Sequence, residues 1–203
     1  MTSLYKAFDT VNHELLLSKL SNLGLSASAV SWFQSYLSNC CHVTRVADSY
    51  SSPGFPSSGV PRGSVLGPTL FSAFINDLPS IPLPDSTVLS ADDTTIYIVI
   101  DSLPSIQSSL QLCLDLANLW LQRKGLKLNA AKTKSMLIHS SKKIVDGNLT
   151  LKIDDRTVER VRCFNFLGVV VNDTLTWVDH FDMLYKKVSH SLNLLRWLSW
   201  FLP

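Results

Sequence analysis

Apolar residues recur along the chain at intervals that predict helices over residues 12–20, 26–37, 65–77, 104–123 and 178–200. Residues typical of helix termini stand at several ends, with Ser26 as an N-cap, Pro104 in a first turn, and Gly24 and Gly125 after C-terminal ends. The second helix is expected to bury Val30, Phe33 and Leu37. The last helix should gather its apolar residues on one face, namely Phe181, Leu184, Val188, Leu192 and Leu195.

Shorter apolar and β-branched runs predict strands at residues 42–47, 87–89, 95–100, 126–128, 136–139, 150–153 and 164–171. The runs 87–89 and 95–100 flank Ser90-Ala91-Asp92-Asp93-Thr94, which predicts a hairpin with both aspartates at its tip. The Ser-, Pro- and Gly-rich stretch 48–58 predicts a turn region. Because helices and strands mix without strict alternation, the predicted fold class is α+β.

Composition restricts the class of protein. The chain has 203 residues, of which 46% are hydrophobic and 17% charged, so it is too apolar to be disordered throughout. No apolar run reaches the roughly 20 residues of a membrane span, and residues 1–6 lack the apolar stretch of a secretion signal. The four cysteines have no metal-ligand spacing. We expect an intracellular protein of the nucleus or cytoplasm that is not secreted.

The net charge of +2 conceals an uneven distribution. Residues 1–122 carry 4 basic and 9 acidic side chains, whereas residues 123–203 carry 14 basic and 7 acidic ones. Between Gly63 and Gln122 there are six aspartates and no Lys or Arg. This division indicates an acidic site in one half and an anion-facing surface in the other, unless both are ordinary solvated faces.

The adjacent Asp92 and Asp93 are the first candidates for chemistry. Two carboxylates on a hairpin with apolar flanks repel each other unless a cation lies between them. Carboxylate oxygens are ligands for Mg²⁺, which commonly binds one or two carboxylates together with phosphate oxygens. The alternative interpretation is a turn with solvated aspartates, since Asp is a common turn residue.

Four segments, in order, resemble the motifs of reverse transcriptases of non-LTR (LINE-type) retrotransposons. They are residues 6–16 (KAFDTVNHELL), 59–68 (GVPRGSVLGP) with 70–71 and 75–79, 91–94 (ADDT), and 125–129 with 132–134, followed by 166–169. The resemblance implies a palm of antiparallel sheet and packed helices plus a partial helical thumb, with the fingers largely missing. It divides the chain into a palm with the polymerase motifs (1–140), a palm–thumb connection with a primer-grip-like hairpin (141–176) and the start of a thumb helix (177–203).

The resemblance also implies roles for individual residues in RNA-directed DNA synthesis from deoxynucleoside triphosphates. Asp92 and Asp93 resemble ligands of a two-Mg²⁺ site, which activates the primer 3′-hydroxyl and stabilises the leaving pyrophosphate. Lys132 resembles a lysine that protonates the pyrophosphate, although a solvated turn lysine is equally compatible with the sequence.

Nucleotide and nucleic-acid contacts are implied elsewhere in the chain. Phe8 resembles the aromatic gate that excludes a ribose 2′-hydroxyl, with a core aromatic as the alternative. The remaining implied contacts are Pro61, Arg62 and Gly63 with the nucleotide, Leu167 and Gly168 as the primer grip, and Arg123, Lys124, Lys127 and Lys134 with the backbone of the RNA template and DNA primer. Gly168 would also suit a plain hairpin. Lys142 and Lys143 are further candidates for the nucleic-acid face, with a solvated loop as the alternative.

The sequence departs from the family pattern at three positions. Counting five residues back from Phe8 reaches Ser3, where the family has a metal-binding aspartate, and a neutral hydroxyl cannot replace that carboxylate. Asp9 is not expected to substitute, because it would lie on the opposite side of a strand from Phe8. Arg62 stands where the family has glutamine, and Ser90 where it has Tyr or Phe.

These observations predict a fragment of a retrotransposon RNA-directed DNA polymerase that is inactive as this chain. A lost metal-ligand carboxylate removes much of the electrostatic stabilisation of phosphoryl transfer, and the missing fingers remove much of the nucleotide pocket. Two alternatives remain: a non-catalytic nucleic-acid-binding remnant, and a degenerate gene copy whose exposed palm surface favours aggregation.

Overall fold

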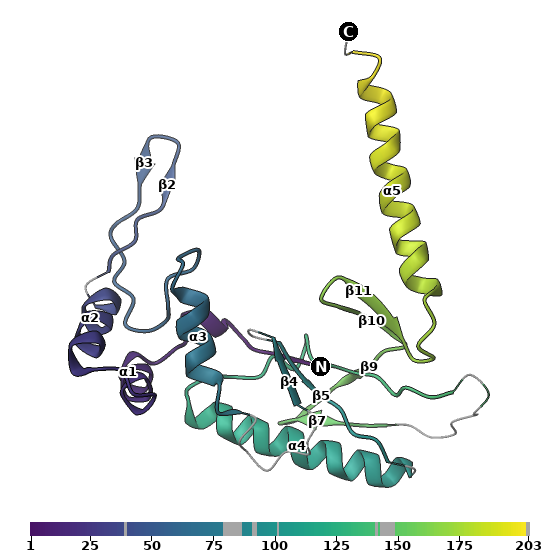
Figure 1. Cartoon of the computed structure of the whole chain (residues 1–203), viewed down its shortest axis with the longest axis horizontal. Coiled ribbons are helices and arrows are strands. Elements are labelled where there is room, and N and C mark those ends of the chain that lie inside the picture. The colour runs from purple at the N-terminus through teal and green to yellow at the C-terminus, as the bar shows by residue number, and fades with distance from the viewer. Residues whose placement is uncertain are drawn as a thin grey trace. The chain divides into compact units, whose positions relative to one another are not determined.

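Two units make up the chain, and the computed structural model describes residues 1–38, 40–78, 87–90, 93–100, 102–140, 142 and 149–201 of it. The first unit comprises residues 1–133 and 151–157, and the second comprises residues 134–150 and 158–203. Figure 1 labels most of the helices and strands of both units.

The predicted helices of the first unit are confirmed. They are α1 (His13–Asn22), α2 (Ala27–Leu37), α3 (Gly67–Ile75) and α4 (Leu103–Arg123). The Asn12 side chain caps α1 by accepting a hydrogen bond from Leu15 N at 3.0 Å, and Ser26 Oγ caps α2 by accepting one from Ala29 N at 3.3 Å. Gly125 follows α4 with φ +73°, a conformation that glycine adopts without steric cost.

The core of the helical part centres on α3, which packs against α1, while α1 also packs against α2 (Figure 1). Four apolar side chains of α3 are buried, namely Leu70, Phe71, Phe74 and Ile75. The prediction for α2 was wrong in part, because Leu37 is buried but Val30 and Phe33 are only half-buried. This helix lies beside α1 at the outer edge of the unit, so much of its surface faces solvent.

A three-stranded antiparallel sheet has the order β1 (Thr2–Ser3), β5 (Asp93–Ile96) and β4 (Thr87–Ser90). The predicted hairpin is confirmed, but its second strand ends at Ile96 rather than Ile100. The prediction that Asp93 lies at the tip was wrong, because the ladder continues to the pair Ser90 and Asp93. Backbone pairing with both neighbouring strands therefore holds Asp93 in the sheet.

The region between α2 and α3 forms a long hairpin. Its strands are β2 (Arg45–Val46) and β3 (Ser49–Tyr50), and His42 and Gly54 form a further antiparallel bridge. The predicted strand 42–47 is therefore shorter than expected, and the stretch 48–58 contains a returning strand besides turns. The first strand ends early because the chain reverses at Ala47, which has a φ of +52°. Val46 and Tyr50, both good strand formers, then pair with Ser49 and Arg45 across the hairpin.

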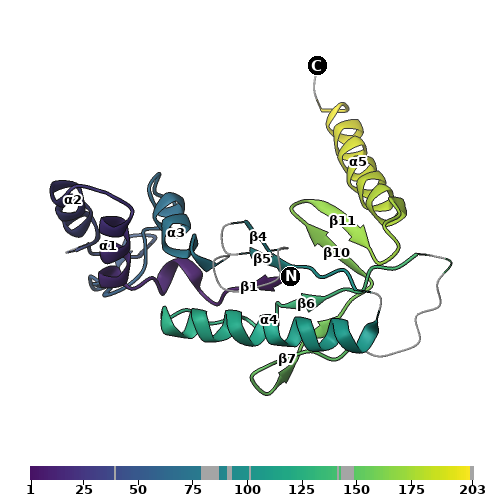
Figure 2. The ribbon, with the colours of Figure 1, turned by 60° about the horizontal axis from the view of Figure 1, so that its bottom comes forward.

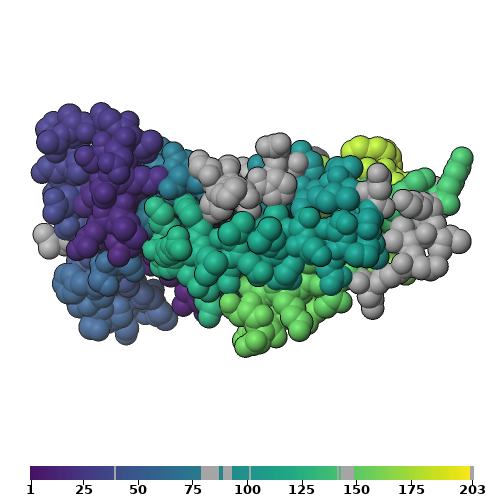
Figure 3. Space-filling model, turned by 90° about the horizontal axis from the view of Figure 1, so that it is seen from below, coloured from purple at the N-terminus to yellow at the C-terminus, as the bar shows by residue number. Residues whose placement is uncertain are grey.

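The hairpin of β7 (Lys152–Ile153) and β8 (Arg156–Thr157) packs against α4 (Figures 2 and 3). The side-chain amide of Gln111 donates to Lys152 O at 2.8 Å and accepts from Lys152 N at 2.9 Å. This side chain of α4 therefore occupies the place of a neighbouring strand. The expected strand 126–128 is reduced to one antiparallel bridge, between Leu4 and Leu128.

Over its described residues, the second unit contains two small sheets and one helix. β6 (Lys134–Ser135) pairs in parallel with β9 (Glu159–Arg160), and β10 (Cys163–Phe166) pairs antiparallel with β11 (Val169–Asn172). The run predicted as one strand at 164–171 is thus a hairpin that turns at Leu167 and Gly168, both with positive φ. No strand forms at the described residues 136–139.

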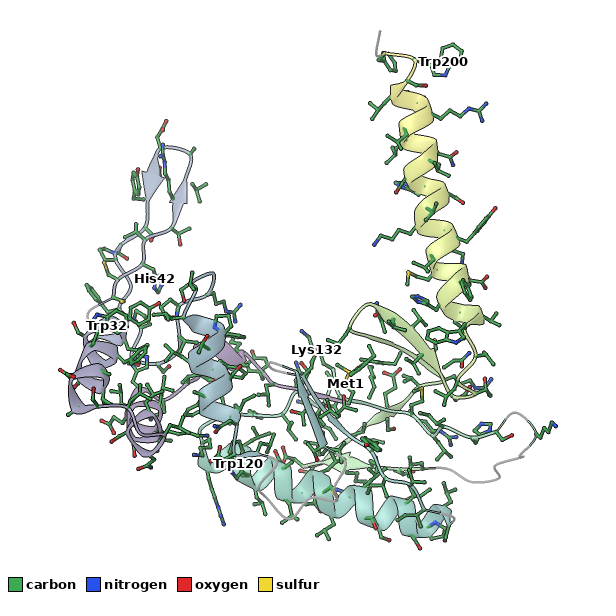
Figure 4. All side chains as sticks on the ribbon, in the orientation of Figure 1. Met1, Trp32, His42, Trp120, Lys132 and Trp200 are labelled. Carbon is green, nitrogen blue, oxygen red and sulfur yellow. The ribbon has the colours of Figure 1, made fainter. Side chains whose placement is uncertain are left out.

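Helix α5 (Val178–Leu198) is confirmed as a helix that contacts β11. None of its described residues is buried, and Trp200, just past its end, is 84% exposed (Figure 4). Within the described residues, no helix is both long and apolar enough to span a bilayer. Helices combined with mainly antiparallel strands confirm the α+β prediction.

Candidate functional site

Strand β1 contributes to the candidate site because of the residue that it pairs with. Ser3 lies directly opposite Asp93 of β5, and the buried Thr2 Oγ1 donates to Thr94 O at 3.1 Å. Directly opposite residues of antiparallel strands project from the same face of the sheet. The serine found where the family has an aspartate is therefore the direct neighbour of one predicted metal ligand. The other predicted ligand, Asp92, lies outside the described residues.

The segment 126–129 runs along the other side of the N-terminal residues. Tyr5 N–H donates to the carbonyl of Lys127, and Asn129 N–H donates to that of Ser3, both at 2.8 Å. These bonds place the fourth predicted motif beside the first, although more than 120 residues separate them.

A turn after Asn129 carries Lys132. The Asn129 carbonyl accepts hydrogen bonds from Lys132 N at 3.1 Å and from Thr133 N at 2.9 Å, and Thr133 is buried. Figure 4 shows Lys132 near Met1, in agreement with the bonds between Asn129 and the N-terminal strand. The buried threonine fixes the turn and leaves the Lys132 ammonium exposed.

The glycine-containing loop at residues 59–63 closes directly on residues 7–11. Gly59 N donates to Val11 O and Val60 N donates to Phe8 O, both at 2.7 Å. A Cβ atom at Gly59 would lie 2.9 Å from backbone atoms of Phe8 and Asp9, and its φ is +94°. Only glycine fits this position without displacing the backbone.

An ion pair links the same two segments. Arg62 Nη2 donates to Asp9 Oδ2 at 2.6 Å, and the two side chains are 63% and 47% exposed. The reason for excluding Asp9 as a substitute carboxylate was wrong, because Ala7–Asp9 form a 3-10 helix rather than a strand. In the structure, Asp9 is directed to the arginine that stands at the family's glutamine position.

These segments surround a cavity of about 570 Å³, a size typical of small-ligand sites. Its lining consists of Ser3, Leu4, Tyr5, Lys6, Ala7, Phe8, Pro61, Arg62, Gly63, Pro68, Asn129 and Lys132. Phe8 is half-buried, with its ring stacked on that of the fully buried Phe71 at a centroid distance of 4.7 Å. The phenylalanine therefore contributes to both the cavity wall and the core of α3.

The charge of the cavity lining is positive. Lys6, Arg62 and Lys132 contribute cations, and no Asp or Glu occurs among the described lining residues. Lys6 has a left-handed backbone conformation with φ +48°, and its ammonium lies 5.6 Å from the Tyr5 ring centroid. The cavity is therefore suited to an anionic ligand.

The described residues do not complete a metal site of the two-ion type. Asp93 is the one described carboxylate beside β1, and its partner across the ladder is the neutral Ser3. Among the residues that the structure describes, no group of three or more His, Cys, Asp or Glu is placed to hold a metal.

Other predicted nucleic-acid residues lie outside this cavity. Arg123 and Lys127 are exposed in the first unit, whereas Lys134 pairs with Glu159 in the second unit. Leu167 and Gly168 form the β10–β11 turn of the second unit. Their roles stay predictions.

The predicted backbone contact Lys124 belongs to a separate cluster near the end of α4. Its Nζ lies 3.6 Å from Asp77 Oδ2 and 5.5 Å from the centroid of the Trp120 ring. Asp77 also pairs with the nearly buried Lys19, whose Nζ donates to Phe74 O at 2.8 Å. Side chains from α1 and α4 thus meet just after α3.

The pKa values in this cluster reflect burial and pairing. Burial lowers the pKa of Lys19, and its hydrogen bond and ion pair with Asp77 offset part of that effect. Partial burial raises the pKa of Asp77, but the hydrogen bond and charge of Lys19, with the charge of Lys124, leave it below its usual value. Helical periodicity did not identify Lys19 as buried, because its partner lies 58 residues away.

Sequence reasoning also missed two contributors to the cavity. Lys6 was included in the first motif without a role, and Asn129 in the fourth motif. The available signal was that Lys6 and Asn129 lie close in sequence to Phe8 and Lys132, which already had assigned roles. The pairing of residues 126–129 with β1 brings both of them to the cavity.

Comparison with known proteins defines the class. The profile of the reverse transcriptase (RNA-dependent DNA polymerase) family matches residues 3–171, so the chain belongs to this family. The match confirms the resemblance that the four motifs indicated, and it includes Ser3 and the loop at residues 59–63.

Individual relatives come from mobile elements. The chain is 29% identical over 202 residues to the probable RNA-directed DNA polymerase from transposon BS of Drosophila melanogaster, covering 96% of this chain and 22% of that protein. It is 28% identical over 204 residues to the RNA-directed DNA polymerase from mobile element jockey of the same organism, with the same coverages. The retrovirus-related Pol polyprotein from type-1 retrotransposable element R1 2 of Nasonia vitripennis is 26% identical over 146 residues, which cover 68% of this chain and 35% of that protein. The chain thus spans less than a quarter of the first two relatives.

Proposed function

We propose that the first unit is the palm of a non-LTR retrotransposon reverse transcriptase and that its cavity receives the incoming deoxynucleoside triphosphate. One observation carries the proposal: residues 3–8, residues 61–63, and Asn129 with Lys132, which come from or directly precede three separate motifs, line a single cavity. RNA template and DNA primer are the corresponding macromolecular partners. In the second unit, the β10–β11 turn corresponds to the primer grip and α5 to the start of the thumb.

Phe8 serves as the gate against a ribose 2′-hydroxyl in this proposal. Its ring belongs to the cavity wall, and its stacking on Phe71 restricts the positions that the ring can take. A rigid aromatic wall can distinguish sugars by the space that it leaves. Pro61 and Gly63 also line the cavity, where the nucleotide would contact the backbone of the loop.

The chain is proposed to be catalytically incompetent as it stands. Asp92 and Asp93 would be the Mg²⁺ ligands and Lys132 the proton donor to pyrophosphate, as the resemblance implies. Ser3 supports incompetence, because it lies opposite Asp93 and brings a neutral hydroxyl where the family has a charged ligand. Loss of one such carboxylate weakens a divalent-cation site whose ligands are hard anionic oxygens.

Primer extension on an RNA template in the presence of Mg²⁺ tests this function. The purified chain should give no extension. When it is fused to a fingers region from a relative, Ser3→Asp should give extension that disappears when Asp92→Ala is added. The matched control is Ser3→Asn, which changes the side chain at the same position without supplying a charge. Extension by the unchanged chain that depends on Asp92 would contradict the proposed incompetence. A folded Ser3→Asp protein that is joined to a fingers region and still inactive would count against Ser3 as the cause.

A second candidate function is nucleic-acid binding without catalysis. It is favoured by the excess of positive charge over residues 123–203, with 14 basic and 7 acidic side chains. Binding of single-stranded RNA should then weaken steeply as salt rises, because lysine and arginine contacts displace counterions. It should also survive Asp92→Ala combined with Asp93→Ala. Salt-independent or absent binding by folded protein would remove this candidate.

A further inference from the structure

The described lining of the cavity around Ser3 is cationic. Three of its described lining residues are cations, and the described lining contains no carboxylate. Asp93 stands across the ladder from Ser3 but is not among the lining residues. Asp9, which lies next in sequence to the lining residue Phe8, is held by Arg62 and lines a different cavity.

A triphosphate entering a site lined by several carboxylates is repelled unless divalent cations neutralise the charges. Replacement of one carboxylate by Ser3 weakens both the repulsion and the hold on the cations. The remaining lysines and arginine can themselves compensate the charge of a polyphosphate through charge-assisted hydrogen bonds. Their charges are accessible, since Lys6 and Lys132 are exposed and the Arg62 side chain is 63% exposed.

We propose that this cavity binds the polyphosphate of a nucleoside triphosphate without a divalent cation, through Lys6, Arg62 and Lys132. The proposal rests on the proposed function, because it concerns the same cavity. It goes further by naming the ligating side chains and by separating binding from the metal. The base and sugar would lie towards Phe8 and the loop at Pro61, which form the uncharged part of the wall.

Arg62 would change partners on binding. Its guanidinium is paired with the Asp9 carboxylate at 2.6 Å, and it lines the cavity at the same time. A triphosphate competes with one carboxylate for this planar donor, which suits both groups. Asp9 thereby tunes the affinity of the cavity without belonging to its lining, as a positioning residue.

Equilibrium binding of deoxythymidine triphosphate to the whole chain, in excess EDTA and in excess Mg²⁺, tests the proposal. We expect similar affinities in the two conditions. In EDTA, Lys132→Gln and Arg62→Gln should each weaken binding about tenfold, the scale of a lost charge-assisted hydrogen bond. Asp9→Asn should strengthen binding by about threefold, because it frees the guanidinium. Inorganic tripolyphosphate should displace the nucleotide, whereas thymidine should not.

Matched controls come from exposed cations of the same unit. Lys152→Gln and Arg156→Gln remove exposed charges on the β7–β8 hairpin and should leave the affinity unchanged. Ser3→Asp should weaken binding in EDTA by about tenfold and restore a requirement for Mg²⁺. Thermal unfolding of each variant identifies any loss of binding that is caused by misfolding. Lys132→Arg retains the positive charge and should therefore keep most of the affinity that Lys132→Gln loses.

The outcomes separate this inference from the proposed function. Binding in Mg²⁺ but not in EDTA would overturn the inference and leave the nucleotide cavity standing. Binding in EDTA that responds to the hairpin controls as much as to Lys132 and Arg62 would overturn it as well. Absence of nucleotide binding by folded protein in both conditions would overturn the proposed nucleotide cavity and the inference together.

Discussion

Helices α3 and α5 use apolar residues in opposite ways. Among the nine residues of α3, the side chains of Leu70, Phe71, Phe74 and Ile75 are buried. Phe71 stacks on Phe8, which lines the cavity. The 21 residues of α5 carry a longer apolar face, yet none of its described residues is buried. An amphipathic pattern therefore predicts a helix equally well in both places but does not determine whether its face is covered.

The two helices differ in how they support the candidate site. In the first unit, burial of α3 fixes Phe71, and stacking transmits that rigidity to Phe8 in the cavity wall. In the second unit, α5 lacks such support within the described residues, so its packing contributes little to stability. Large apolar faces of this kind are typical of interaction surfaces or of aggregation liabilities.

Among the substitutions that only remove side-chain atoms, the largest expected effect is that of Phe71→Ala. Removing a fully buried aromatic ring creates a cavity, and we expect the free energy of unfolding to fall by about 3–5 kcal/mol. Urea denaturation followed by circular dichroism measures the loss. The matched change on α5 is Phe181→Ala, which removes the same ring from a 65% exposed position and should cost far less. Equal losses would contradict the contrast between the two helices.

Replacement of a glycine should likewise cost more stability in the first unit than in the second. Gly59→Ala places a Cβ 2.9 Å from the backbone of residues 8 and 9 at φ +94°, and should cost about 2–3 kcal/mol. Gly168→Ala in the β10–β11 turn has a similar φ of +89° but open space around it. Its cost should be near 1 kcal/mol, at about the level of a left-handed conformation alone. Denaturation midpoints that are equal for the two variants would show that the backbone contact at Gly59 is unimportant.

A third prediction compares ion pairs. Lys19→Met removes the nearly buried partner of Asp77 and should lower the free energy of unfolding by about 2 kcal/mol. Lys134→Met breaks the pair with the 65% exposed Glu159 and should cost about 0.5 kcal/mol or less. Thermal unfolding at neutral pH distinguishes them. A larger loss for Lys134→Met would reverse the expected order.

The Asp77 pair also predicts a dependence on pH. Because the pKa of Asp77 is lower in the folded chain than in the unfolded one, its ionised form stabilises the fold above about pH 4. That contribution is lost as the pH falls through the folded-state pKa. Asp77→Asn should therefore show a flatter decline in stability with acid than the unchanged chain. Its side chain is 40% exposed, so the difference should be about 1 kcal/mol. Parallel acid curves for the two proteins would contradict this account.

The smallest effect is expected on the apolar face of α5. Leu192→Lys changes a 59% exposed side chain and should alter the free energy of unfolding by about 0.5 kcal/mol or less. Leu16→Lys, at a fully buried position of α1, is the control and should prevent stable folding of the first unit. A strong loss of stability for Leu192→Lys would show that its face is covered.

Local signals in the sequence were sufficient for the helices and the motifs. The caps at Asn12 and Ser26 and the glycine after α4 act within one helical turn, so nearby residues specify them. Ser3 was found by counting along one short motif. The order of the four motifs was likewise enough to indicate the family that the profile match confirms.

Tertiary structure decided how those pieces combine. The opposition of Ser3 and Asp93, the pairing of Arg62 with Asp9 and the burial of Lys19 join residues 90, 53 and 58 positions apart. The chain between such partners contains no local signal for their contact, because strand register and helix packing bring them together. The sequence by itself thus determined the helices, the family and the missing carboxylate. Long-range packing decided that Asp93 joins the sheet, that α3 is covered while α5 is not, and that the cavity lining is cationic.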